Sequence, residues 1–207
     1  MSRPFVIGLT GSIGMGKSET AKMFAKLGVP IFDTDAVVHR LYERGGSAVP
    51  QIAKAFPSCV AQGAVDRASL AAKVAADTRS FRTLESIVHP LVAEEQRRFL
   101  DDAESHGIEM VVLDVPLLFE TGSHARMDAI VVVSAPAESQ RSRVLSRPGM
   151  TTEKLDQILA RQLPDSEKRA KADFVVETSQ GLDHAFEQVK RIVTLLHRRR
   201  LKDHNIA

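Results

Sequence analysis

The segment that most restricts how this sequence can fold is the glycine-rich run Gly11-Ser-Ile-Gly-Met-Gly-Lys-Ser18. Glycine stands at the first and sixth positions, and lysine and serine follow, which is the pattern of a phosphate-binding loop (P-loop). Such a loop turns successive backbone N–H groups toward phosphate oxygens, and glycine best tolerates the backbone angles required. The loop also needs a strand before it and a helix after it.

The flanking sequence supplies that setting. The apolar run Phe5–Leu9 precedes the loop, and the amphipathic pattern Lys17–Leu27 follows it, with Gly28 as a stop signal. The positive N-terminal end of this helix would add to the attraction for phosphate. Glu19, not glycine, stands three places after Gly16, which disfavours a dinucleotide-binding loop.

Further apolar runs rich in β-branched residues are typical of buried parallel strands. They are Val29–Phe32, Met110–Val115, Ala129–Val133 and Phe174–Val176. Helical patterns alternate with them, so we predict an α/β fold with a doubly wound parallel sheet of the P-loop NTPase type. A chain of 207 residues is sufficient for one such domain over residues 1–207.

The segment from about 37 to 109 is longer than a single crossover helix needs. It contains the helical stretches Ala68–Ala76 and Arg79–Ser105 and lacks a strong strand. We interpret it as a helical insertion that binds the phosphoryl acceptor. The segment from about 137 to 171 is a predicted basic lid, because eight lysines or arginines lie between Arg141 and Lys171. The charge pattern alone fits a solvated helix pair equally well.

Several side chains are candidates for phosphoryl transfer. Lys17 can reach the β- and γ-phosphates, and the Ser18 hydroxyl can bind Mg²⁺. Asp114 ends an apolar strand, where an acid that holds Mg²⁺ or its water is expected. Asp33 and Asp35 follow the second strand and would face the same side if the backbone stays extended. One could then accept a hydroxyl proton and either could hold a Mg²⁺ water; the alternative is that they cap the next helix.

Cations from the lid would complete the site. We expect Arg143 and Arg147, four residues apart, to share a helix face and to point to one phosphate group. Weaker candidates are Arg161, Lys168 and Lys171. His89 precedes Pro90, and proline in the first turn of a helix is ordinary, so the pattern alone favours a structural role for His89.

Composition excludes several classes of protein. The formal net charge of +2 gives no general reason for nucleic-acid binding, and no apolar stretch is near the ~20 residues of a membrane span. The single cysteine, Cys59, cannot form an intramolecular disulfide, so we expect a cytoplasmic protein. The expected partner is a small-molecule substrate, with no nucleic acid or membrane, and the chain is expected to be a monomer or a weak homo-oligomer.

Taken together, these features resemble the dephospho-coenzyme A kinases over essentially the whole chain. The motifs that carry the resemblance are Gly8–Ser18, Asp33-Thr-Asp35, Ile87-Val-His-Pro90, Val112–Glu120 and Ala172–Val176. The resemblance implies a phosphotransferase that uses ATP and Mg²⁺ to phosphorylate the ribose 3′-hydroxyl of dephospho-coenzyme A, which is the last step of coenzyme A biosynthesis.

The resemblance also implies roles for individual residues. Asp35 would be the catalytic base, acting with Lys17, Arg143 and Arg147. The residues expected to bind ATP are Gly11, Ser12, Ile13, Gly14, Met15, Gly16, Lys17, Ser18 and Glu19. Those expected near the acceptor are Thr10, Asp35, His89 and Pro90, and those near the metal are Ser18, Asp33 and Asp114. The chain departs from the family pattern at Ser12, Met15, Glu19 and Glu177-Thr178, and the last departure leaves the adenine contact open.

Two rival functions remain open. Another P-loop kinase, acting on a nucleoside or nucleotide, would share the core chemistry and differ only in the insertion and the acceptor motifs. A nucleotide-dependent binding switch would need an Asn-Lys-x-Asp guanine-reading segment, which we do not find, and Asp114-Val-Pro-Leu lacks the glycine of a switch loop. A nucleic-acid motor is opposed by the short chain and the near-neutral charge.

Overall fold

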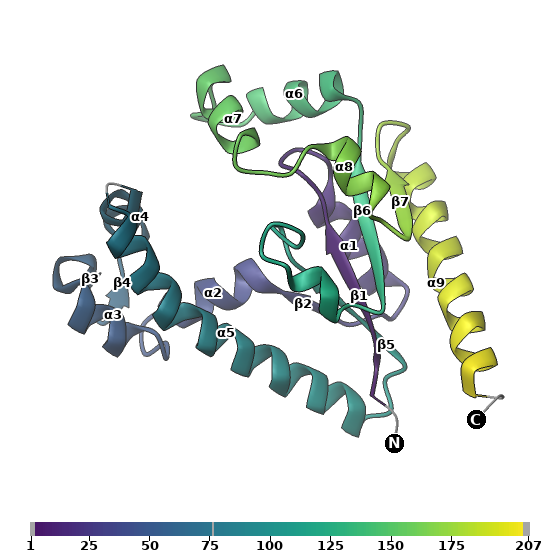
Figure 1. Cartoon of the computed structure of the whole chain (residues 1–207), viewed down its shortest axis with the longest axis horizontal. Helices are drawn as coiled ribbons and strands as arrows, with labels where there is room; N and C mark the ends of the chain where they lie inside the picture. Colours follow the sequence, from purple (N-terminus) through teal and green to yellow (C-terminus); the bar gives the residue numbers. More distant parts are fainter. Residues whose placement is uncertain (1–2, 76, 205–207) are drawn as a thin grey trace. The chain divides into compact units, whose positions relative to one another are not determined.

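The computed structural model describes residues 3–75 and 77–204, with side chains up to Arg199. The chain divides into two compact units. One is Phe32–His106, which we call the insert unit, and the other, the P-loop unit, contains the described residues up to Ile31 and from Gly107 onward. The chain passes between them within strand β2 and again after His106 (Figure 1).

A five-stranded sheet forms the centre of the P-loop unit. Its strands are β1 (Phe5–Thr10), β2 (Ile31–Asp33), β5 (Met110–Asp114), β6 (Ala129–Ser134) and β7 (Phe174–Glu177). The order is β2-β5-β1-β6-β7, and the pairs β1–β5, β1–β6 and β6–β7 are parallel. The predicted doubly wound parallel sheet is confirmed, with strand ends shifted by one or two residues.

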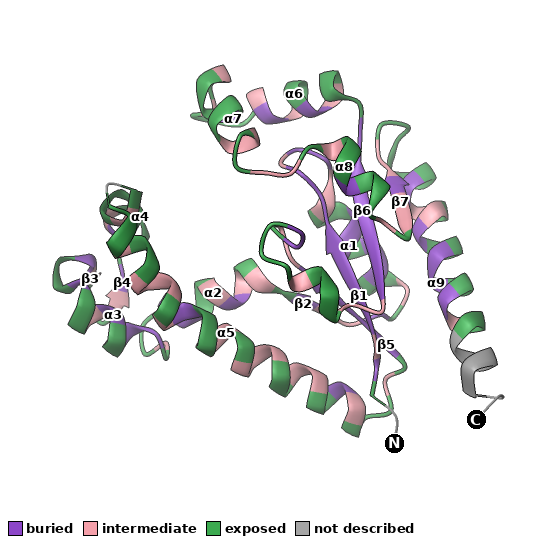
Figure 2. Cartoon of the chain, in the orientation of Figure 1, coloured by how far each residue is buried: buried purple, intermediate pink, exposed green. Residues whose placement is uncertain are grey.

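The two faces of the sheet bury different side chains. Along β6, Val131 and Val133 pack into the larger core with helices α1 (Lys17–Lys26) and α9 (Leu182–His204). The alternate residues, Ile130 and Val132, join the smaller core with Leu118 and Phe119. Because both faces are covered, the central strands are continuous apolar runs and not alternating, and Figure 2 shows β5 and β6 buried along their length.

The strand order places the glycine-rich loop at a special point of the sheet. From β1 the chain goes through α1 to β2 on one side, whereas from β6 it continues to β7 on the other side. Ligands of open α/β sheets bind at the carboxyl ends of the strands where the chain direction diverges in this way. The loop after β1 lies at that position.

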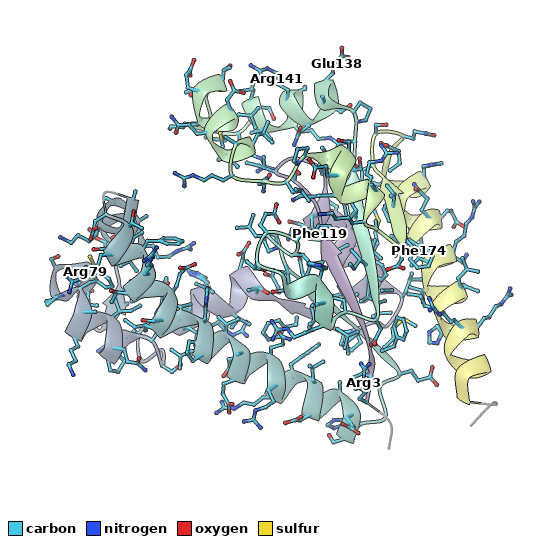
Figure 3. All side chains as sticks on the ribbon, viewed as in Figure 1. Arg3, Arg79, Phe119, Glu138, Arg141 and Phe174 are labelled. Atoms are coloured by element: carbon cyan, nitrogen blue, oxygen red, sulfur yellow. The ribbon has the colours of Figure 1, made fainter. Side chains whose placement is uncertain are left out.

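Between β6 and β7 the chain forms helices α6 (Ala137–Leu145), α7 (Thr152–Leu159) and α8 (Asp165–Ala170), where the sequence predicted two helices. Arg141, labelled in Figure 3, pairs with Asp156 at 3.5 Å and links α6 to α7. The Thr151 hydroxyl caps α7 by accepting a bond from the Lys154 N–H. The short helix η2 (Ser123–Arg126) precedes β6.

The insert unit is mostly helical. Its elements are α2 (Thr34–Tyr42), α3 (Val49–Ala55), η1 (Pro57–Cys59), β3 (Val60–Ala61), β4 (Ala64–Val65), α4 (Arg67–Ala75) and α5 (Thr78–Ser105). Strands β3 and β4 form a small antiparallel hairpin. Phe32 packs against Phe99 of α5, with ring centroids 5.5 Å apart. Among the described residues, no helix has both the length and the apolar character of a membrane span.

Helix α5 begins at a strong cap and contains a proline. Asp77 accepts hydrogen bonds from Arg79 and Ser80, and these bonds, that of the Ser80 hydroxyl above all, lower the pKa of the Asp77 carboxyl. The predicted helical stretch Arg79–Ser105 is confirmed, and Pro90 lies inside this helix and not in its first turn. Long-range packing and the cap outweigh the local cost of one missing backbone bond.

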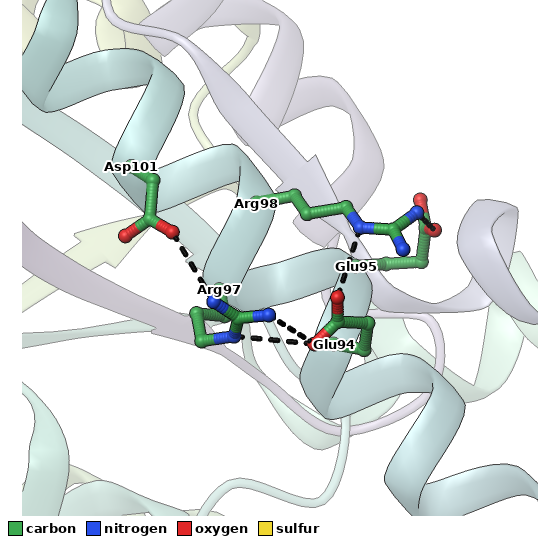
Figure 4. A network of polar contacts seen from close by, with 5 residues as sticks. All are labelled: Glu94, Glu95, Arg97, Arg98 and Asp101. Atoms are coloured by element: carbon green, nitrogen blue, oxygen red, sulfur yellow. Dashed lines mark hydrogen bonds and ion pairs between the residues drawn. The ribbon is translucent and has the colours of Figure 1, made fainter.

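The exposed face of α5 carries a network of charges (Figure 4). Glu94 accepts from both Arg97 (2.6 Å) and Arg98 (3.0 Å), Arg98 also pairs with Glu95 (3.2 Å), and Arg97 lies 3.6 Å from Asp101. Pairs three and four residues apart support a solvated helix.

Candidate active site

The glycine-rich loop joins the end of β1 to the first turn of α1. Gly14 and Gly16 have φ values of 78° and 98°, where a side chain would strain the backbone. Space is restricted as well, since a Cβ on Gly11 would lie 2.7 Å from the carbonyl oxygen of Val133. One on Gly14 would overlap the Val144 side chain. Glycine is therefore required at these positions by conformation or packing.

The first turn of α1 is open to an anion. Gly16 is the N-cap residue, and it has no side chain to accept hydrogen bonds from the N–H groups of that turn. The first N–H groups of a helix also have no partner within the helix. The Thr20 N–H and hydroxyl close the turn by donating to the Gly16 carbonyl, at 3.1 and 3.2 Å. The open N–H groups and the positive end of the helix make this turn suited to a phosphate group.

Lys17 and Asp114 form an ion pair beside the loop. Asp114 is the register partner of Leu9 in the β1–β5 ladder, so its carboxylate lies next to the end of β1. Lys17 Nζ donates to Asp114 Oδ1, and the two side chains are only 16% and 5% exposed. The structure thus brings the predicted phosphate-binding lysine and the predicted metal-binding acid together.

The other loop residues differ in exposure. Thr10 is buried, and its hydroxyl donates to the Pro116 carbonyl at 3.1 Å. Ser12 is also buried, whereas Ser18 is exposed at the start of α1. Glu19 is exposed and pairs with a lysine of the same helix, so its side chain points to solvent.

Neutral side chains bind several backbone groups of the loop. Gln140 Nε2 donates to the Ile13 carbonyl (2.8 Å), and the Ile13 N–H donates to Gln162 Oε1 (3.1 Å). The Thr178 hydroxyl donates to the Met15 carbonyl (2.7 Å). Our sequence reasoning missed both glutamines, because uncharged residues in a basic segment give no motif or charge signal. Thr178 was visible only as a departure from the family pattern.

Arg143 also contacts the loop. Its guanidinium donates to the Thr178 hydroxyl (2.9 Å) and carbonyl (2.7 Å), and to the Gly14 carbonyl (3.4 Å). Arg143 therefore lies against the P-loop in this structure, with its charge next to the phosphate-binding turn. Its predicted contact with phosphate stays a prediction.

Arg147 is not on the same helix face as Arg143. Helix α6 ends at Leu145, and Arg147 is an exposed residue of the following turn. The prediction of a shared face is wrong, because the residue before Pro148 is disfavoured in the α conformation and the helix stops first.

Asp33 and Asp35 belong to the insert unit. The backbone does not stay extended beyond Asp33, since α2 begins at Thr34. Asp33 is the N-cap residue, and its Oδ1 accepts from the Ala36 N–H at 2.9 Å, so the capping alternative is confirmed for Asp33. Asp35 lies in the first turn of α2 and is exposed.

His89 and Pro90 lie together on α5 and are exposed. His89 Nε2 is 3.8 Å from Glu85 Oε1, one turn earlier on the same helix. This spacing is a surface pair, and such a pair leaves the imidazole accessible to a ligand.

Lys168, a weaker lid candidate, is fully buried. Its Nζ lies 3.0 Å from Glu120 Oε1, and the Leu163 N–H donates to the same oxygen at 2.7 Å. Burial acts to raise the Glu120 pKa, but the bond from Leu163 and the charge of Lys168 hold the pKa below its ordinary value. Lys168 is thus paired inside the P-loop unit and does not face an open site.

The donor set fits Mg²⁺ as P-loop proteins bind it. Within the described ranges, no three His, Cys, Asp or Glu side chains gather as a metal site of their own. A P-loop Mg²⁺ needs only one or two protein oxygens, since phosphates and waters complete its shell. The Ser18 hydroxyl at the loop and the Asp114 carboxylate beside it meet this requirement.

The parallel sheet, the glycine loop at the point where the strand order diverges, and its paired lysine define a P-loop kinase. Comparisons with known proteins agree with this class and identify the family within it. The family model for dephospho-CoA kinase matches residues 5–184. The chain belongs to the dephospho-CoA kinase family.

Individual relatives cover nearly the whole chain. A dephospho-CoA kinase of Rhodopseudomonas palustris is 57% identical over 188 residues, which are 91% of this chain and 94% of that protein. One from Mesorhizobium japonicum is 54% identical over 94% of this chain and 98% of that protein.

Solved structures share the fold. The Thermus thermophilus protein TT1252 is 34% identical, with a TM-score of 0.80, and the match covers 94% of this chain and 98% of that one. A dephospho-CoA kinase from Campylobacter jejuni is 18% identical, with a TM-score of 0.65, over 93% of this chain and 97% of that one. The latter likeness concerns the fold alone.

Proposed function

We propose that this chain transfers the γ-phosphoryl group of ATP to the ribose 3′-hydroxyl of dephospho-coenzyme A, producing coenzyme A and ADP. The observation that carries the proposal is the preformed P-loop with its Lys17–Asp114 pair, in a chain that matches dephospho-CoA kinases over 91% of its length. The reaction would complete coenzyme A biosynthesis.

The P-loop unit would supply the electrostatic part of catalysis. Charge on the transferring phosphoryl group is stabilised by positioned N–H donors and cations. The open first turn of α1 provides the donors, and Lys17 provides a cation. On ATP binding, Lys17 would exchange the Asp114 carboxylate for phosphate oxygens.

Ser18 and Asp114 would hold Mg²⁺, directly or through water, and Asp33 would support one of its waters. The ion would neutralise charge on the β- and γ-phosphates. Asp33 already caps α2 through one oxygen, and a carboxylate has the capacity to accept further hydrogen bonds.

Asp35 would be the general base for the acceptor hydroxyl. It is exposed in the first turn of α2, and the capping bond of that helix falls to Asp33. Support for the choice of Asp35 is therefore its accessible carboxylate together with the family resemblance.

The remaining predicted contacts stay proposals for individual residues. His89 and Pro90, exposed on α5, would contact the acceptor. Thr10, which is buried at the end of β1, would have to give up its bond to the Pro116 carbonyl to do the same. Arg143 and Arg147 would bring positive charge to the phosphates from the lid. The buried free thiol of Cys59 supports a cytoplasmic location, and a monomer or weak homo-oligomer stays the prediction.

The decisive assay is ADP release from Mg-ATP with dephospho-coenzyme A set against adenosine, AMP and pantetheine. We expect the highest kcat/KM with dephospho-coenzyme A and no acceptor-dependent release from a folded Lys17→Ala control. A higher kcat/KM with adenosine or AMP would show that the chain is a nucleoside or nucleotide kinase instead.

A further inference from the structure

One residue of the P-loop, Ile13, is held at both its backbone N–H and its carbonyl by side chains that the proposed mechanism does not use. Ile13, at the third position of the loop, donates its N–H to Gln162 Oε1 at 3.1 Å and accepts a bond on its carbonyl from Gln140 Nε2 at 2.8 Å. Gln140 is only 7% exposed, so this contact is enclosed by protein.

The two bonds fix the direction of the backbone around Ile13. A carbonyl oxygen is the negative end of a peptide dipole, and one turned into the loop would repel phosphate oxygens. Gln140 binds the Ile13 carbonyl and Gln162 binds the Ile13 N–H, so both groups are engaged by the protein. The next residue, Gly14, has a positive φ of 78°, so the chain turns directly after Ile13 through a conformation that glycine adopts readily.

Gln162 is itself carried by an anchored segment. The next residue, Leu163, donates its N–H to Glu120 Oε1 at 2.7 Å, and the buried Lys168 lies 3.0 Å from the same oxygen. Ser134, at the end of β6, donates to Asp165 Oδ2 at 2.7 Å. These contacts fix residues 163–168 to Glu120 and to the end of β6 within the P-loop unit.

We propose that Gln162 is a positioning residue for phosphoryl transfer: by accepting the Ile13 N–H, it holds the start of the P-loop in the conformation that presents the later N–H groups to phosphate. The proposal deepens the proposed kinase function and depends on it for the turnover measurements. Glu120 acts on the loop through Gln162, because it fixes the backbone that carries this side chain. The part of the basic lid segment from Gln162 onward would then be fixed to the rest of the P-loop unit.

The test compares Gln162→Met, Gln162→Glu and the control Gln157→Met. Methionine keeps the length of the side chain but removes the acceptor, whereas glutamate keeps an acceptor oxygen and adds a charge. Gln157 is an exposed residue of the neighbouring helix α7. For Gln162→Met we expect kcat/KM for ATP to fall about 3- to 10-fold, which corresponds to the net free energy of one hydrogen bond. KM for dephospho-coenzyme A should stay unchanged, the melting temperature should fall by only about 2–4 °C, and Gln157→Met should match the wild type.

The pH profile of Gln162→Glu separates positioning from a merely structural role. A glutamate carboxyl titrates near pH ~4.3 in water and at higher pH beside phosphate charge. We therefore expect the activity of this variant, relative to the wild type, to be lowest at about pH 8 and to rise toward about pH 5.5 as the carboxyl becomes neutral. Gln162→Met should show no such rise.

Binding of a non-hydrolysable ATP analogue, measured by calorimetry without an acceptor, keeps the test independent of the acceptor's identity. Weaker binding by Gln162→Met than by Gln157→Met supports the proposal even if dephospho-coenzyme A were not phosphorylated. The proposal is overturned if Gln162→Met binds and turns over ATP like the wild type. It is overturned equally if its loss of activity is accompanied by a matching loss of melting temperature and disappears on cooling.

Discussion

Replacing Glu120 by glutamine would leave the Lys168 ammonium without its counter-ion inside the P-loop unit. Lys168 is 0% exposed and Glu120 retains 17% exposure, so the charge that remains is the more deeply buried one. Glutamine keeps an oxygen that can accept the Leu163 N–H, which isolates the loss of charge from the loss of that bond.

The expected cost follows from the burial of the pair. Removing one partner of a buried ion pair costs about 3–5 kcal/mol, because the other charge is left uncompensated. The partial exposure of Glu120 lets solvent screen some of the charge, so we expect the free energy of unfolding to fall by about 2–4 kcal/mol. Adding Lys168→Met to Glu120→Gln should recover much of this loss, since the buried ammonium is then removed as well.

The pH dependence has a definite sign. The Glu120 pKa is lower in the folded protein than its ordinary value of 4.5, so the carboxylate contributes stability that is present above pH 4.5. This contribution is lost as the pH falls through the folded-state pKa. The wild type should therefore exceed Glu120→Gln in free energy of unfolding by the whole amount at neutral pH, and this excess should shrink below pH 4.5.

Urea unfolding of the wild type, both single variants and the double variant, at neutral and acidic pH, measures these quantities. Glu94→Gln is a matched control, because it removes a carboxylate from the exposed ion pairs of α5 and should change stability little. The reasoning is refuted if Glu120→Gln unfolds within about 0.5 kcal/mol of the wild type, or if the two single effects simply add in the double variant.

Three further predictions concern catalysis. A folded Lys17→Ala variant should lose orders of magnitude in kcat, and retention of more than about a tenth, a loss of only ~1.4 kcal/mol, would contradict its role. Asp35→Asn should lower kcat by roughly 10²-fold with little change in ATP affinity. At saturating Mg-ATP, Asp33→Asn should lower kcat less than Asp35→Asn does. If Asp33→Asn lowers kcat more, Asp33 and not Asp35 is the general base. Residues 141–161 should gain protease protection when a non-hydrolysable ATP analogue and Mg²⁺ bind, and unchanged cleavage would argue against a closing lid.

The sequence predicted the central sheet and the loop because both have strong local signals. Buried parallel strands such as Met110–Asp114 are continuous apolar runs, and the glycines of the P-loop are fixed by conformation and space. The Lys17–Asp114 pair follows from these, since adjacent parallel strands bring their carboxyl ends together.

Other features depend on contacts that no local pattern encodes. Gln140 and Gln162 act through backbone groups of a distant loop, and neither has a charge or spacing that marks it. The local pattern at Pro90 is typical of a first helical turn, but the Asp77 cap and packing along α5 carry the helix through it. Strands of two residues, such as β3, are too short for any periodicity to appear.

The Lys17–Asp114 pair would oppose nucleotide binding as well as support it. If Lys17 binds phosphate as proposed, it must leave the Asp114 carboxylate, and separating the two charges would offset part of the free energy of ATP binding. The same opposition would act on ADP after transfer and would favour its release. Weaker binding of the nucleotide in the ground state would in turn favour turnover, as long as the transition state is not weakened equally.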